Sequence, residues 1–232
     1  MASSVVRTGA LLLVAALWLS GCVQEGSAQV DNPLTAEQRA EYYIQTVEIS
    51  IHPNAILSWE TAHAQLAEDA GVDPDDPLAV ARFADSPEGD AALRALLEQR
   101  MRDVLVPKLE TVLGTGEKPA FLAVQAASLN IIPPGQQIVL GAGVHGIGGG
   151  LQVYDLETGE RLTRAQIMAG GAAASSGIGG VMRDQSLGDP LGRVLDAFAV
   201  FSVAWLSATH PIKLPWPNVN NEFPDLPGPK GS

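Results

Sequence analysis

Ala120-Phe121-Leu122-Ala123-Val124-Gln125-Ala126 is a continuous apolar run in which glutamine is the one polar residue. A continuous apolar run of this length is typical of a central β-strand that is covered on both faces. Leu129 and Ile131 extend the run, and Pro133-Pro134-Gly135 then predicts a turn. We therefore expect a sheet with this strand in its interior.

The residues before this strand predict one further strand and several helices. Thr46–Ile51 alternates apolar and polar side chains, which predicts a strand with one buried face, and Pro53 is expected to end it. Short helices are expected after Thr35 and from Ser58 to Gly71. Ser86-Pro87 opens the longest helix, whose apolar residues recur every three or four positions. These residues are Leu93, Leu97, Met101, Val104, Leu105, Leu109 and Val112.

The residues after the central strand predict more strands and one last helix. Alternation at Ile138, Leu140, Ala142 and Val144 indicates a strand, and residues 151–155 and 161–167 are expected to form a hairpin closed by residues 156–160. The last helix runs from Asp189 to about Ala208. This order predicts a single α+β domain over residues 36–209, with a mostly antiparallel sheet of four to five strands and helices on one face.

The helix at residues 189–208 contains a ten-residue, almost wholly apolar run, which raises the alternative of a membrane span. The run is shorter than the roughly 20 residues that a span requires, so we expect a core helix lying across the sheet. Phe198, Phe201 and Trp205 should cover the sheet, and Phe201→Asp should unfold the domain.

Two segments are expected to lack regular structure. Gly170–Gly180 contains mostly Gly, Ala and Ser and predicts a mobile loop. Residues 210–232 hold many prolines among scattered aromatic residues such as Trp216 and Phe223, which predicts a disordered tail.

The N-terminal residues have the pattern of an export signal. Arg7 precedes an apolar run from Ala10 to Leu19, and small residues lead to Cys22, the sole cysteine of the chain. Leu19-Ser20-Gly21-Cys22 resembles the lipobox of bacterial lipoproteins. The resemblance implies a signal peptide at residues 1–21, cleavage between Gly21 and Cys22, and acylation of Cys22. It also implies export to the outer membrane, because Val23 rather than aspartate follows the cysteine.

Composition narrows the classes of partner. Cleavage of the leader removes Arg7 and no acidic residue, so the mature chain carries 13 basic and 26 acidic side chains, a net charge of −13. A chain without a basic patch is poorly suited to nucleic acid or to electrostatic binding of anionic lipid. Residues 22–35 then read as the acylated cysteine followed by a flexible tether, and the acyl chains on Cys22 hold the protein to its membrane.

Asp73, Asp75 and Asp76 form the one acidic cluster with a possible ligand. Clustered carboxylates suit hard cations, but this segment lacks the glycine and distal glutamate of a calcium loop. The alternative is that Asp73-Pro74-Asp75-Asp76-Pro77 marks helix boundaries, where aspartate caps and proline opens the first turn.

Gly141–Gly150 matches G-x-G-x-x-G, the fingerprint of dinucleotide sites, but a strand rather than a helix is expected to follow it. We interpret it as a strand with glycine kinks. His52, His63, His145 and His210 lack the spacing of metal ligands, and no serine motif of a catalytic triad occurs. We therefore predict no catalytic residue, cofactor or metal.

The segment Leu151–Leu162, a strand ending in Asp155 followed by a Thr-Gly turn, is similar to hairpins in bacterial envelope lipoproteins and assembly factors. These include curli-secretion-like lipoproteins and TolB amino-terminal-like domains. The resemblance implies a lipid-anchored, periplasm-facing protein with a binding or accessory role in assembly and an envelope protein as partner. An envelope hydrolase with a site assembled from distant residues, and a cation- or solute-binding lipoprotein, are the alternatives.

Overall fold

The computed structural model describes residues 28–30, 34–114, 116–140, 143–210, 212–214 and 224–229. Their main sheet has the strand order β2-β3-β4-β5. The strand β2 (Tyr42–Ser58) is parallel to β3 (Lys118–Asn130), and the other two pairs, formed with β4 (Gly143–Asp155) and β5 (Gln166–Ala174), are antiparallel. The prediction of an α+β domain with a mostly antiparallel sheet is confirmed.

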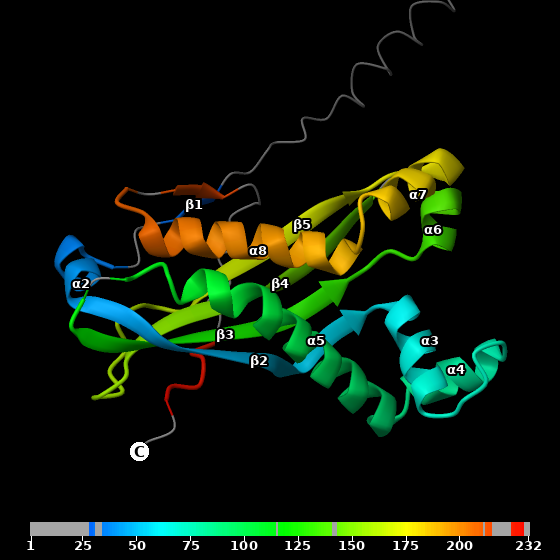
Figure 1. Ribbon diagram of the computed structural model, residues 1–232, viewed down its shortest axis with the longest axis horizontal. Coiled ribbons are helices and arrows are strands. Elements are labelled where there is room, and N and C mark those ends of the chain that lie inside the picture. The colour runs from blue at the N-terminus through cyan, green and yellow to red at the C-terminus, as the bar shows by residue number, and fades with distance from the viewer. Residues whose placement is uncertain are drawn as a thin grey trace, which may run out of the picture.

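Two long helices, α5 (Pro87–Leu109) and α8 (Pro190–Ser207), cover one face of this sheet, as Figure 1 shows. Five shorter helices lie at its ends, and a second small sheet pairs two short strands antiparallel. The shorter elements are α2 (Ala36–Glu41), α3 (Glu60–Asp69), α4 (Pro77–Ala84), α6 (Pro134–Leu140), α7 (Gly177–Ser186), β1 (Ala28–Val30) and β6 (Ile212–Leu214).

The helix α5 forms as its apolar stripe predicts. The Ser86 hydroxyl caps its first turn by accepting from the Gly89 amide at 3.1 Å. The buried residues of the predicted stripe are Leu93, Leu97, Met101, Leu105 and Leu109, and all of them except Leu93 belong to the main core against the sheet. The short helix after Thr35 is confirmed as well, since Thr35 and Gln38 form a capping box.

The helix α8 lies across the sheet, as predicted, and makes very close contact with β5. A Cβ atom on Gly170 would stand 2.4 Å from the Val194 carbonyl oxygen, so only glycine allows this approach. Phe198 is fully buried, whereas Phe201 is half-buried, so Phe198 is the better place to disrupt the core. By length and composition α8 is also the one helix of the described residues that could cross a membrane, and 44% of it is buried inside the domain.

The central strand β3 is buried on both faces, as its apolar run predicts. Ala120, Leu122 and Val124 belong to the main core beneath the helices. Phe121 and Ala123 face the opposite side, where they form a second cluster with Tyr154 and Leu226. The cover on this second face comes from the C-terminal segment.

The prediction that residues 210–232 are disordered is wrong for residues 224–229. Leu226 is 4% exposed, its amide donates to Gln152 Oε1 at 2.8 Å, and its carbonyl oxygen accepts from the Tyr154 hydroxyl. Asp225 pairs with Arg161. Proline lacks the backbone N–H that a strand donates, so a proline-rich segment rarely forms a central strand, but its side chains can still dock on a sheet. Trp216 and Phe223 lie outside the described residues.

Three local predictions before and within the sheet are wrong. β2 does not end at Pro53, which lies in a stretch of irregular register between Ile51 and Ile56. Ser58 remains in this strand, and the helix that follows has Trp59 at its N-cap. The strand expected from Ile138 to Val144 is helical at residues 138–140, which end α6, and only Val144 of its alternating residues lies in a described strand. Pro134 suits a first helical turn, and the apolar alternation there is short.

The two glycine-rich stretches both have regular structure. Gly170–Gly180 is not a loop, since it contains the end of β5 and the start of α7. Residues 143–155 form one continuous strand, and its pairing with β5 starts at Gln166, with only a single bridge from Tyr154 to Arg161 in the expected hairpin. Gly159 adopts φ +71°, which agrees with the turn expected there.

Candidate functional site

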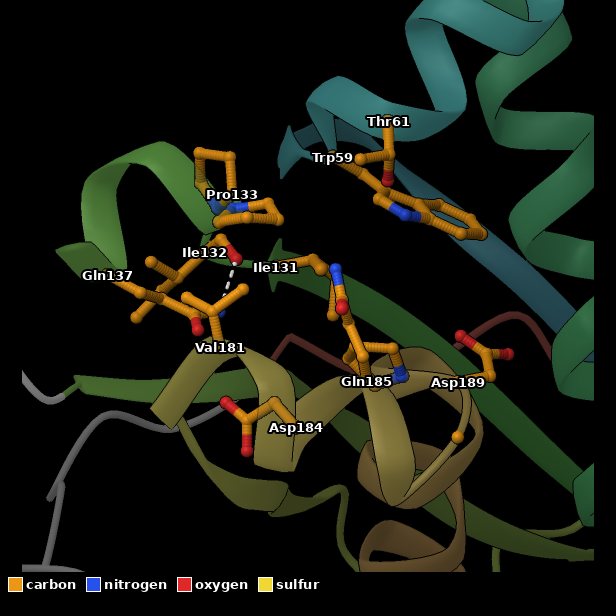
Figure 2. Close-up of a pocket in the computed structure, with 13 residues that line it drawn as sticks. Trp59, Thr61, Ile131, Ile132, Pro133, Gln137, Val181, Asp184, Gln185 and Asp189 are labelled. Carbon is orange, nitrogen blue, oxygen red and sulfur yellow. Dashed lines mark hydrogen bonds between the residues drawn. The ribbon is translucent and has the colours of Figure 1, made fainter. Parts of the chain in front are cut away.

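A pocket of about 320 Å³ lies where one end of the sheet meets α3, α6, α7 and α8 (Figure 2). Its volume is at the lower end of the range for small-molecule sites. The residues that line it are Trp59, Thr61, Ile131, Ile132, Pro133, Pro134, Gln137, Val181, Asp184, Gln185, Gly188, Asp189 and Pro190.

The parallel pair of strands places the pocket. β2 and β3 run in the same direction, so their carboxyl ends lie together, and the Ile131 amide donates to the Ser58 carbonyl at 2.8 Å. Trp59 follows the first strand and Ile131 the second, and both side chains reach the pocket. In sheets with parallel strands, this edge is where ligands commonly bind.

The pocket wall combines apolar groups with a few hydrogen-bonding groups. Trp59 and the two prolines that lead into α6 supply rigid apolar surface, while Thr61 and Gln185 supply hydroxyl and amide groups. Asp189 caps α8 by accepting from the Leu191 amide at 3.0 Å. Such a wall suits a ligand with an apolar body and some polar groups.

Behind the wall lies a cluster of polar side chains from four elements: Gln137, His145 and Asp184, which are buried, and Arg193, which is half-buried. His145 is fully buried, and its Nδ1 accepts from the Ile132 amide at 3.1 Å, while Gln137 donates to the Ile132 carbonyl at 3.1 Å. Asp184 accepts from the Ser175 amide at 2.9 Å and lies 3.8 Å from Arg193.

This cluster has spare hydrogen-bonding capacity. Within the described residues, Gln137 Oε1, His145 Nε2, and Nε and Nη2 of Arg193 are buried without a partner. Burial holds the pKa of His145 below its usual range, and Arg193 lowers that pKa further while Asp184 opposes the shift. Gln137 and Asp184 belong to both the cluster and the pocket wall, so the polar groups adjoin the pocket.

The residues predicted as sites lie elsewhere. Cys22 and Gly21 are outside the described residues. Asp76 caps α4 by accepting from the amides of Leu78 and Ala79, and Asp73 accepts from the Asp75 amide at 3.0 Å. These bonds match the interpretation as a helix boundary, and no group of three or more His, Cys, Asp or Glu in the described part of the chain could hold a metal ion.

Of the G-x-G-x-x-G match, Gly143 and Gly146 lie in β4, which agrees with the strand interpretation, and Gly141 lies outside the described residues. Gly149 in the same strand marks a close approach of β3, because a Cβ there would stand 2.2 Å from the Gln125 carbonyl oxygen. The histidines are dispersed: His52 is in β2, His63 in α3, His145 in β4, and His210 after α8. Sequence reasoning missed the pocket. The available signal was an aromatic residue and a Pro-Pro pair at the ends of two strands.

The described residues form one α+β domain with a pocket at the sheet's end. Comparison with protein families, curated proteins and solved structures finds no match.

Proposed function

We propose that this chain is a lipid-anchored envelope protein, held through Cys22 and facing the periplasm, whose domain acts by binding as an accessory or assembly component. The sequence Leu19–Cys22 supports the anchor through its likeness to a lipobox. The net charge of −13 for the mature chain agrees with an acyl anchor, because the chain has too few basic residues to be held to anionic lipid by charge.

The observation that carries the binding role is the pocket at the carboxyl ends of β2 and β3. Rigid apolar groups, foremost Trp59, offer surface to an apolar body with little loss of side-chain entropy. Thr61 and Gln185 can fix its orientation by hydrogen bonds. A side chain or a small apolar group from an envelope partner fits these dimensions.

Site-specific photo-crosslinking in the bacterium that makes the protein tests this role. A photoreactive residue replaces Gln185 at the pocket or, as the control, Gln99, which is equally on the surface but on α5. We expect a discrete adduct from position 185 and none from position 99. Adducts of the same pattern from both positions, or from neither, would contradict a binding site at the pocket.

A further inference from the structure

One end of the domain exposes aliphatic side chains from neighbouring elements. α6 and α7 lie against each other at this end, beside the start of β4 (Figure 1). Val139 on α6 is 79% exposed, Ile178 and Met182 on α7 are 69% and 66% exposed, and Val144 on β4 is 60% exposed. We call Val139, Val144, Ile178 and Met182 the aliphatic tip.

The tip belongs to the part of the chain that has almost no charge. No Asp, Glu, Lys or Arg occurs between Lys118 and Asp155, nor between Arg164 and Arg183, although the chain carries a net charge of −12. On α7, Asp184 is buried, so Arg183 is the one exposed charge of this helix, and it is positive. Arg183 forms no ion pair with any residue that the structure describes.

We infer that the aliphatic tip docks on a phospholipid bilayer. The four side chains of the aliphatic tip lie in segments of the chain that hold no acid, so these segments can enter the headgroup region without burying a carboxylate of their own, and Arg183 can meet a lipid phosphate. A protein partner is less well matched, because the tip presents no exposed aromatic residue of the kind that anchors protein interfaces. A second copy of this chain would bring two unpaired Arg183 side chains toward the same surface.

The position of the tip suits a protein that is also anchored at its N-terminus, so this inference extends the proposed function and rests on it. β1 lies near the C-terminal end of α8, and the tip lies toward the other end (Figure 1). α8 has 18 residues and is about 27 Å long. Cys22 is six residues before Ala28, a reach of at most about 21 Å. A tether of this reach allows the anchor and the aliphatic tip to meet the same bilayer while α8 lies between them.

Fluorescence quenching on the full lipidated protein tests the docking. Acylation occupies Cys22, so Val139→Cys provides one free thiol for an environment-sensitive fluorophore, and Ile178→Cys provides another. Ile56→Cys and Leu78→Cys are matched controls, because these residues are apolar and 77% and 73% exposed but lie on β2 and α4. Each labelled protein is reconstituted in phosphatidylcholine vesicles with or without spin-labelled phosphatidylcholine.

We expect spin-labelled lipid to reduce emission at positions 139 and 178 by about twofold or more, with little change at positions 56 and 78. Arg183→Glu should weaken this quenching. If spin-labelled lipid changes the emission equally at all four positions, and the protein floats with the vesicles, the docking is overturned and the anchor stands. Protein that does not float with the vesicles would contradict the anchor. In that case the fluorescence of the labelled protein is measured after vesicles are added, and emission at position 139 that spin-labelled lipid does not quench also overturns the docking. Quenching at position 139 by a labelled second copy, without lipid, would assign the tip to self-association.

Discussion

Replacing Leu226 by alanine tests whether the C-terminal segment is part of the fold. Leu226 is 4% exposed and fills the second core cluster against Phe121 and Tyr154, while its backbone bonds to Gln152 and Tyr154 survive the substitution. Truncating a buried leucine to alanine costs 2–5 kcal/mol, and a surface segment relaxes easily, so we expect a loss of about 2 kcal/mol. For a domain of this size, that loss lowers the unfolding midpoint by about 4–8 °C.

The assay is urea and thermal unfolding followed by far-ultraviolet circular dichroism, on the mature chain with Cys22→Ser. Leu78→Ala is the control, because Leu78 is 73% exposed and its truncation should change the free energy of unfolding by less than about 0.5 kcal/mol. Deleting residues 224–232 should cost at least as much as Leu226→Ala, since Phe121 then becomes exposed. If Leu226→Ala is no more destabilising than Leu78→Ala, the segment does not dock and a disordered tail is the better description.

Three further predictions concern the core. Burial lowers the pKa of His145 in the folded state, so unfolding takes up a proton below the ordinary histidine pKa, and stability should fall as the pH drops below about 6.5. His145→Gln should make the unfolding midpoint in thermal melts less dependent on pH. His63→Gln removes another histidine whose pKa burial lowers, and it measures how much of the pH dependence comes from that residue. Gly170→Ala should destabilise by about 2 kcal/mol in urea unfolding because its Cβ would meet the backbone of α8, whereas Gly179→Ala, with open space, should not destabilise. Phe198→Asp should leave the chain unfolded by circular dichroism, since the charge would be buried without a partner; a native spectrum would contradict its place in the core.

The elements with a strong repeat could be predicted from the sequence. The apolar stripe of α5 and the continuous apolar run of β3 are visible in consecutive residues, and each pattern corresponds to the way its element is buried. The structure of the glycine-rich segment could not be predicted from the sequence, because the requirement for Gly170 comes from α8, which is distant along the chain. Glycine at a close contact and glycine in a loop look alike until the contacting helix is known.

The candidate site was harder to predict than the fold. The pocket depends on β2 being parallel to β3 and on where α7 and α8 pack, and no local pattern encodes either fact. His145 was recognised only as a residue without metal-ligand spacing, because its burial beside Arg193 is a consequence of packing. The lipid anchor, in contrast, is predicted from four consecutive residues of the sequence, and these residues lie outside those that the structure describes.

Mass spectrometry of the N-terminal peptide of the mature protein, purified from membranes of its own cells, tests the central proposal most directly. We expect the mature chain to begin at Cys22 and this residue to carry a diacylglycerol on its thiol and an acyl group on its new amino terminus. Cys22→Ser should remove both modifications and release or mislocalise the product. A mature chain that begins at any other residue, or an unmodified Cys22 in the membrane fraction, would contradict it.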